Sequence, residues 1–262
     1  MGVDLCVEDA PQVLRADEVA ASRPSLAASK EAVRTDAPKT AAPLPTPQPP
    51  APLPSIAGAI EEARALADGA ADLATLEAAV RGFNGCSLKK TATNTVFAQG
   101  VAASRLMFIG EAPGAEEDRS GVPFCGASGK LLDRMLSFIG LTRAENFYIT
   151  NTLFWRPPGN RQPTAEELEI CRPLVEKHIA LVDPKILVLV GGTATKTILR
   201  SALGITRLRG QVFTYKNDYM ASEVPVHVLY HPSYLLRQPL AKKQCWADLL
   251  ALKDALHGQK TQ

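Results

Sequence analysis

The sequence predicts an α/β fold, in which helices cover both faces of a parallel sheet as three layers, α/β/α. Short apolar segments alternate along the chain with longer segments whose apolar residues recur every three or four positions. Residues 186–190 (ILVLV) are apolar throughout, as is typical of a central parallel strand that is covered on both faces. Because 46% of the 262 residues are hydrophobic, the chain can bury a sizeable core.

The first 54 residues do not share this pattern. Residues 37–54 (APKTAAPLPTPQPPAPLP) hold eight of the chain's 20 prolines, which remove backbone donors and favour an extended linker. Residues 1–36 are polar and rich in alanine. We therefore expect residues 1–54 to be an acidic, disordered tail and linker, and residues 55–262 to form the folded domain.

Two helices are expected at the start of that domain. Ser55 is a suitable N-cap for the first, and Asp72 lies at the start of the second. The apolar faces consist of Ile60, Ala63 and Leu66 in the first helix and Leu73, Leu76 and Val80 in the second.

Four strands and four helices then alternate. The strands are predicted at residues 105–110 (RLMFIG), 146–151 (NFYITN), 186–190 (ILVLV) and 224–230 (VPVHVLY), which gives a central four-stranded parallel sheet. The helices are expected at residues 128–139, after the N-cap Thr164 with Glu166 and Glu167 in its first turn, after Gly191-Gly192, and at residues 240–257.

Charge is distributed unevenly along the chain. Residues 1–80 contain 6 Lys/Arg and 12 Asp/Glu, a net −6, whereas residues 81–262 contain 23 and 15, a net +8. A basic domain behind an acidic tail suits a polyanionic partner, although ordinary surface charge also explains it.

Cysteine usage and the N-terminus indicate a cytoplasmic protein. No apolar run reaches the length of a membrane helix, and MGVDLCVEDA lacks the pattern of a signal peptide. The cysteines are odd in number and widely spaced, so we expect reduced thiols at Cys6, Cys86, Cys125, Cys171 and Cys245.

Three polar side chains follow the predicted strands. Glu111 comes after the first strand, Asn151 ends the second, and His231 follows the fourth. Ligands bind at the carboxyl ends of strands in such sheets, so these groups are expected to converge on one site. Each has a simpler explanation on its own, namely helix capping, a turn and packing beside Pro232.

Five motifs follow one another between residues 83 and 255. They are GEAPGAEED (110–118), GVPFCGASGKLLDRML (121–136), YITNTLFWRPPGNRQP (148–163), VLVGGTA (188–194) and HPSYLLR (231–237). In these motifs and their order, the chain resembles family 4 of the uracil-DNA glycosylase superfamily. The fold of that family, a parallel four-stranded sheet between helices, agrees with the strands predicted above.

The resemblance implies a monofunctional DNA repair enzyme, a hydrolase that flips uracil from DNA and leaves an abasic site. Glu111 and His231 are the implied catalytic residues, acting at the sugar and at uracil O2. Asn151 would read the edge of uracil, Phe124 would stack on it, and Glu117 would exclude thymine. The implied uracil-binding residues are Asn151, Phe124, Glu117, Gly110, Ala112 and Gly114.

DNA contacts are expected beyond the base pocket. Tyr234, Leu235 and Leu236 offer an apolar wedge for the space left by the base, although the leucines also suit a helix core. The implied DNA-binding residues are Ser233, Tyr234, Leu235, Leu236, Arg237, Arg156, Arg161 and Lys130.

The chain departs from the family at the residues that hold its iron–sulfur cluster. The four matching positions are Phe83, Cys86, Trp155 and Cys171, so only two thiols remain. A cluster needs about four protein ligands, and we therefore expect no cluster, no metal and no other cofactor. The aromatic side chains are expected to fill the vacated space.

Three other functions remain open from the sequence. One is a glycosylase for another deaminated base such as hypoxanthine, and another is a protein that binds uracil or abasic DNA with weak turnover. The third, a small-molecule enzyme, is disfavoured by the basic domain and by the absence of a GxGxxG or P-loop pattern. The expected partners are uracil-containing DNA, abasic product and free uracil, with the protein acting as a monomer, in a prokaryote at the nucleoid.

Overall fold

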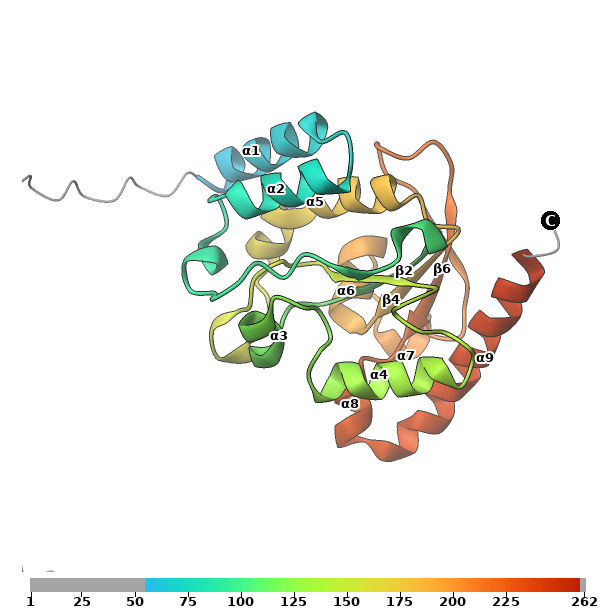
Figure 1. Ribbon diagram of the computed structural model, residues 1–262. Coiled ribbons are helices and arrows are strands. Elements are labelled where there is room, and N and C mark those ends of the chain that lie inside the picture. The colour runs from blue at the N-terminus through green and yellow to red at the C-terminus, as the bar shows by residue number, and fades with distance from the viewer. Residues whose placement is uncertain (1–54, 260–262) are drawn as a thin grey trace, which may run out of the picture. The chain divides into compact units, whose positions relative to one another are not determined.

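The computed structural model describes residues 55–259 (Figure 1). The tail and linker expected over residues 1–54 lie outside the described residues. A mixed sheet with the strand order β1-β3-β2-β4-β6-β5 runs through the described part of the chain. Helices cover both of its faces, so the predicted three-layer α/β fold is confirmed.

The four central strands are parallel and match the predicted ones. Two short strands that the sequence analysis missed pair antiparallel at the edges, β1 beside β3 and β5 beside β6. In chain order the strands are β1 (Gln99–Gly100), β2 (Leu106–Gly110), β3 (Tyr148–Asn151), β4 (Ile186–Val190), β5 (Phe213–Tyr215) and β6 (Val224–Leu229).

The alternation of side chains along β2 divides the core into two halves. Met107 and Ile109 face one buried cluster, whereas Leu106 and Phe108 face the other. This follows from the two-residue period of a strand, which directs successive side chains to opposite faces. Every residue of β2 is buried, as expected for a strand between two helical layers.

Helices α1 (Ile56–Gly69), α2 (Leu73–Gly82) and α5 (Ala165–Val182) gather on the face of Met107 and Ile109, at the top of Figure 1. The predicted N-caps are confirmed, since the side chains of Ser55 and Asp72 accept hydrogen bonds from the backbone N–H groups of Gly58 (3.2 Å) and Thr75 (2.7 Å). Thr164 and Glu167 form a capping box at the start of α5. Helix α6 (Gly192–Leu199) begins as predicted and adds Ile198 to this cluster.

Three helices cover the opposite face, at the bottom and right of Figure 1. These are α4 (Ala127–Ser137), α8 (Pro232–Arg237) and α9 (Lys242–Gln259). The shorter elements are α3 (Ala115–Ser120), α7 (Ile205–Leu208), η1 (Ser87–Lys90), η2 (Ala102–Ser104), η3 (Pro158–Asn160) and η4 (Pro239–Ala241).

The register of the sheet positions the predicted site. Gly110 at the end of β2 lies opposite Asn151 at the end of β3, and β6 leads into His231. Because these strands are parallel, their carboxyl ends lie at one edge of the sheet. No helix in residues 55–259 is long and apolar enough to cross a membrane.

Candidate active site

A cavity of about 530 Å³ opens at the carboxyl edge of the sheet. Glu111, Asn151 and His231, predicted from three separate strand ends, all line it. Other predicted residues on its wall are Ala112, Gly114, Glu117, Phe124, Arg161, Ser233, Tyr234 and Arg237.

His231 is held in one orientation by Ser233. Its Nδ1 accepts a hydrogen bond from the Ser233 backbone N–H at 3.2 Å and lies 2.8 Å from the Ser233 hydroxyl oxygen. A neutral ring whose Nδ1 accepts must carry its proton on Nε2. Burial, with Arg237 adding to it and Glu117 opposing it, lowers the pKa of His231 to about 4. The imidazole is therefore neutral near pH 7 and offers Nε2–H as a donor.

Asn151 is buried and packs closely against β2 and the loop of Phe124. A Cβ atom at Gly110 would overlap both the Phe124 ring and the Asn151 side-chain oxygen. Glycine at position 110 is therefore what allows the amide and the ring to share one wall of the cavity. Asn151 is only 2% exposed, so any partner of its amide must enter the cavity to reach it.

Phe124 adopts a strained backbone conformation beside His231. Its φ is +53°, in the left-handed region, which costs a residue with a bulky side chain about 1–2 kcal/mol. The ring lies 5.9 Å from the His231 ring, centroid to centroid, and is 5% exposed. The loop also approaches α4 so closely that a Cβ atom at Gly129 would overlap the Phe124 carbonyl.

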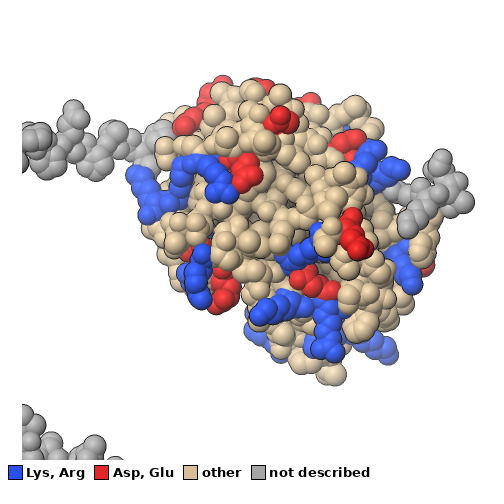
Figure 2. Space-filling view, in the orientation of Figure 1, with Lys and Arg blue, Asp and Glu red and all other residues tan. Residues whose placement is uncertain are grey.

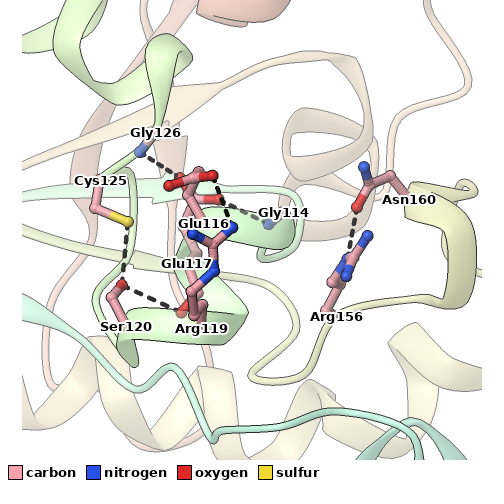
Figure 3. Close-up of polar contacts among 9 residues, drawn as sticks. All are labelled: Gly114, Glu116, Glu117, Arg119, Ser120, Cys125, Gly126, Arg156 and Asn160. Carbon is pink, nitrogen blue, oxygen red and sulfur yellow. Dashed lines mark hydrogen bonds and ion pairs between the residues drawn. The ribbon is translucent and has the colours of Figure 1, made fainter.

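Glu117 joins two loops of the cavity, as Figure 3 shows. One carboxylate oxygen accepts from the Gly114 backbone N–H and the other from the Gly126 backbone N–H, each at 3.0 Å. The loop after β2 is thereby tied to the loop before α4. The side chain lines the cavity, but its carboxylate already serves this structural connection.

Hydrogen bonds hold the backbone of Glu111 in place. Its carbonyl accepts from the Thr152 hydroxyl at 2.6 Å and from the Leu153 N–H at 3.2 Å, which anchors it to the end of β3. Glu111 is half-buried and lines the cavity. The loop after β2 therefore presents a carboxylate from a fixed backbone.

The predicted wedge is divided between surface and core. Tyr234 is 37% exposed and Leu236 is 46% exposed. Leu235 is fully buried in the core between α4, α8 and α9, so its assignment to the wedge is corrected to the packing alternative. Successive side chains of a helix point about 100° apart, so Leu235 lies on the side that packs into the core while Tyr234 and Leu236 flank it at the surface.

The predicted phosphate contacts differ in their surroundings. Arg237 and Arg161 line the cavity, but Arg161 forms a two-pronged ion pair with Glu167 at 2.9 and 2.5 Å. Arg156 donates to the Asn160 side chain at 2.7 Å (Figure 3), and Lys130 is exposed on α4, outside the cavity wall. Basic and acidic side chains are interspersed on the face in Figure 2, so a single basic patch does not dominate it.

Two aromatic rings and two thiols are buried in the core cluster that includes α1, α2 and α5. Phe83 and Trp155 are each 1% exposed, with ring centroids 6.3 Å apart. The Trp155 indole N–H donates to the Thr95 hydroxyl at 3.0 Å. Cys86 and Cys171 are buried free thiols in the same core, where the hydrogen bond to Cys86 and burial raise the pKa of Cys171.

Sequence reasoning missed several residues around the cavity. Ser128, Pro157 and Asn160 line it, and they lie within motifs that the sequence analysis quoted. Arg143 hydrogen-bonds to the loop of Phe124, and nothing in the sequence pattern singled it out.

Comparison with known proteins adds a family assignment. Residues 97–250 match the model of the uracil DNA glycosylase superfamily. The chain is 40% identical over 179 residues to the type-4 uracil-DNA glycosylase of Archaeoglobus fulgidus, covering 67% of this chain and 88% of that protein. It is 38% identical to the type-4 enzyme of Sulfurisphaera tokodaii (64% and 78% covered) and 32% identical to a type-5 uracil-DNA glycosylase of Pyrobaculum aerophilum (50% and 62%).

Proposed function

Because this chain belongs to family 4 of the uracil-DNA glycosylase superfamily, we infer that it hydrolyses the bond between uracil and deoxyribose in DNA. One observation carries the assignment of roles: Glu111, Asn151 and His231 line a single cavity at the carboxyl edge of the sheet. A base inside a duplex cannot reach such a cavity, so uracil must be flipped out of the stack.

Asn151 reads the base in this proposal. Its amide donates to uracil O4 and accepts from N3–H, whereas cytosine presents the reversed pattern there. A mismatched base would leave buried polar groups unpaired, at a cost of about 1–3 kcal/mol per group. Phe124 stacks on the flipped ring from the neighbouring loop, and Glu117 lies on the wall that would exclude the thymine methyl group.

His231 and Glu111 act on the bond that breaks. Negative charge develops on the departing uracil, and the fixed Nε2–H of the neutral His231 donates to uracil O2. Glu111 positions the attacking water and favours the positive charge that develops on the sugar. The proton lost by water ends on the departing base or in solvent, so the products are free uracil and an abasic site. No lysine in the motifs is placed to form a Schiff base, which suits hydrolysis without strand cleavage.

We also propose that the enzyme works as a monomer and without an iron–sulfur cluster. The donor set does not fit one: Phe83 and Trp155 offer no thiolate, and their rings are buried in the same core cluster as Cys86 and Cys171. Purified protein should therefore lack stoichiometric iron and the broad visible absorption of such clusters. Iron at about four atoms per chain after aerobic purification would contradict this proposal.

The test of the function uses an oligonucleotide with a single uracil, treated with alkali after incubation so that abasic sites become strand breaks. Cleavage by the wild-type protein that is lost in the Asn151→Ala and His231→Ala variants supports the proposed roles. The His257→Ala variant, which changes an exposed histidine on α9, is the matched control and should retain cleavage. Binding without product would instead indicate a damage-binding protein, and attack on hypoxanthine but not on uracil would indicate a different base specificity.

A further inference from the structure

Arg143 connects four segments of the chain around the loop of Phe124. It lies in the turn between α4 and β3, and its side chain is 15% exposed. Its Nε donates to the Asp133 carboxylate at 2.8 Å, and one terminal nitrogen donates to the Gln99 side-chain oxygen at 2.8 Å. The terminal nitrogens also donate to the backbone carbonyls of Pro123 (2.6 Å) and Phe124 (2.5 Å).

These contacts hold a conformation that the loop would not favour alone. Phe124 has a φ of +53°, and its carbonyl is pressed toward Gly129 on α4. Two successive carbonyls converge on one side chain, and the planar fork of an arginine satisfies both while a third donor stays on Asp133. A lysine carries the same charge but cannot present donors in these fixed directions.

We propose that Arg143 is a positioning residue, which orients the Phe124 ring for stacking on the flipped base. It lies outside the cavity wall and acts only through the loop. This inference rests on the proposed function, because it gives the loop geometry a role in base excision. On the other side of the same loop, Glu117 holds the Gly126 N–H, so the segment is fixed at both ends.

The first measurement is the single-turnover rate of uracil excision by the Arg143→Lys variant. The rate should fall about tenfold to a hundredfold, since displacing a positioning group by about 1 Å has effects of this size. Affinity for uracil-containing DNA should change much less, because the DNA-facing side chains remain. The matched control is Arg105→Lys, since Arg105 also forks onto a turn, through the Asp183 carbonyl (2.7 Å) and carboxylate (2.5 Å), at the opposite edge of the sheet.

A double-mutant cycle separates positioning from general stability. If Arg143 acts through the ring, Arg143→Lys should slow excision less than twofold in a Phe124→Ala background, whereas independent effects would multiply. Equal slowing in both backgrounds, or a single variant as fast as Arg105→Lys, would overturn the inference.

Hydrogen exchange gives a readout that does not depend on activity. The backbone amides of residues 121–126, other than Pro123, should exchange faster in Arg143→Lys than in the wild type. The milder Asp133→Asn variant keeps the arginine and should show a smaller increase, and it replaces Arg143→Lys in this test if that variant does not fold. Unchanged exchange in the loop would overturn the inference even in an active enzyme. If Arg143→Lys alters exchange in the loop but the wild-type protein excises no uracil, the contact between Arg143 and the loop is supported and the proposed function is overturned.

Discussion

The hydrogen bonds of His231 determine how the cavity responds to pH. Ser233 occupies Nδ1, and burial lowers the pKa of the ring to about 4, so the proton remains on Nε2 through the neutral range. A free histidine would instead be half protonated near pH 6.5. The Nε2–H donor that we propose for catalysis is therefore present at its full population well into the acid range.

The first prediction concerns the pH dependence of excision. The single-turnover rate of the wild-type protein should show no inflection near pH 6.5 that belongs to His231. The rate should fall through protonation of His231 only near pH 4, where the ring loses its neutral form. An inflection near pH 6.5 that disappears in His231→Gln would contradict it. For stability the sign is the same: because the folded pKa is lowered, the contribution of His231 is complete above about pH 6.5 and declines as the pH falls toward 4.

At the level of secondary-structure elements, Glu117 connects α3 to α4, while Asp118 accepts from the backbone N–H groups of Thr93 and Asn94. Helix α3 is only six residues long, and the Glu117 carboxylate ties its start and the start of α4 through Gly114 and Gly126. Charge-assisted hydrogen bonds of this kind are stronger than neutral ones, and both carboxylate oxygens are used. The Glu117 side chain thus links the short helix to the start of α4.

The second prediction is that Glu117→Gln lowers the free energy of unfolding by about 1–3 kcal/mol, because an amide offers one acceptor oxygen to two N–H donors. Urea denaturation followed by circular dichroism measures it, and excision should slow as the two loops separate. Glu116→Gln is the control, because that exposed residue pairs with Arg119, 3.0 Å away, in an exposed ion pair worth at most about 1 kcal/mol. Equal stability of the two variants would contradict the prediction.

Elements with a long apolar pattern or a clear N-cap were predictable from the sequence, whereas the short edge strands were not. The apolar run of β4 and the caps Ser55, Asp72 and Thr164 indicated their elements directly. The edge strands β1 and β5 are two and three residues long, too short for a two-residue period to be recognised.

Some residues of the site were likewise predictable from the sequence, whereas others were brought together only by the fold. Its three central side chains were predictable because each follows a strand, and parallel strands end at one edge. Arg143 was not, because its partners lie 10 to 44 positions away in the sequence and only the fold brings them together. Leu235 and Leu236 were indistinguishable as a pair in sequence, and only the packing of α8 assigns one to the core.

At the scale of the whole molecule, the cavity lies where two packed halves meet. The core cluster with α1, α2 and α5 supports the segment after β3, which carries Pro157 and Arg161 to the cavity wall. Trp155 lies in this segment and packs against Phe83 and Phe154. The support of one cavity wall therefore depends on aromatic packing at these positions.

The third prediction compares the chain's two tryptophans. Trp155→Ala should destabilise the fold by about 3–5 kcal/mol, because it removes a side chain that is 1% exposed and leaves a cavity beside Phe83 and Phe154. Trp246→Ala, at a 38% exposed position on α9, should cost far less. The midpoints of thermal unfolding distinguish the two variants. Excision by Trp155→Ala, measured below the midpoint of its thermal unfolding, should also be slower than in the wild type, because the cavity wall that carries Arg161 loses its support. A Trp155→Ala protein as stable and as active as Trp246→Ala would show that this aromatic cluster does not hold the cavity in place.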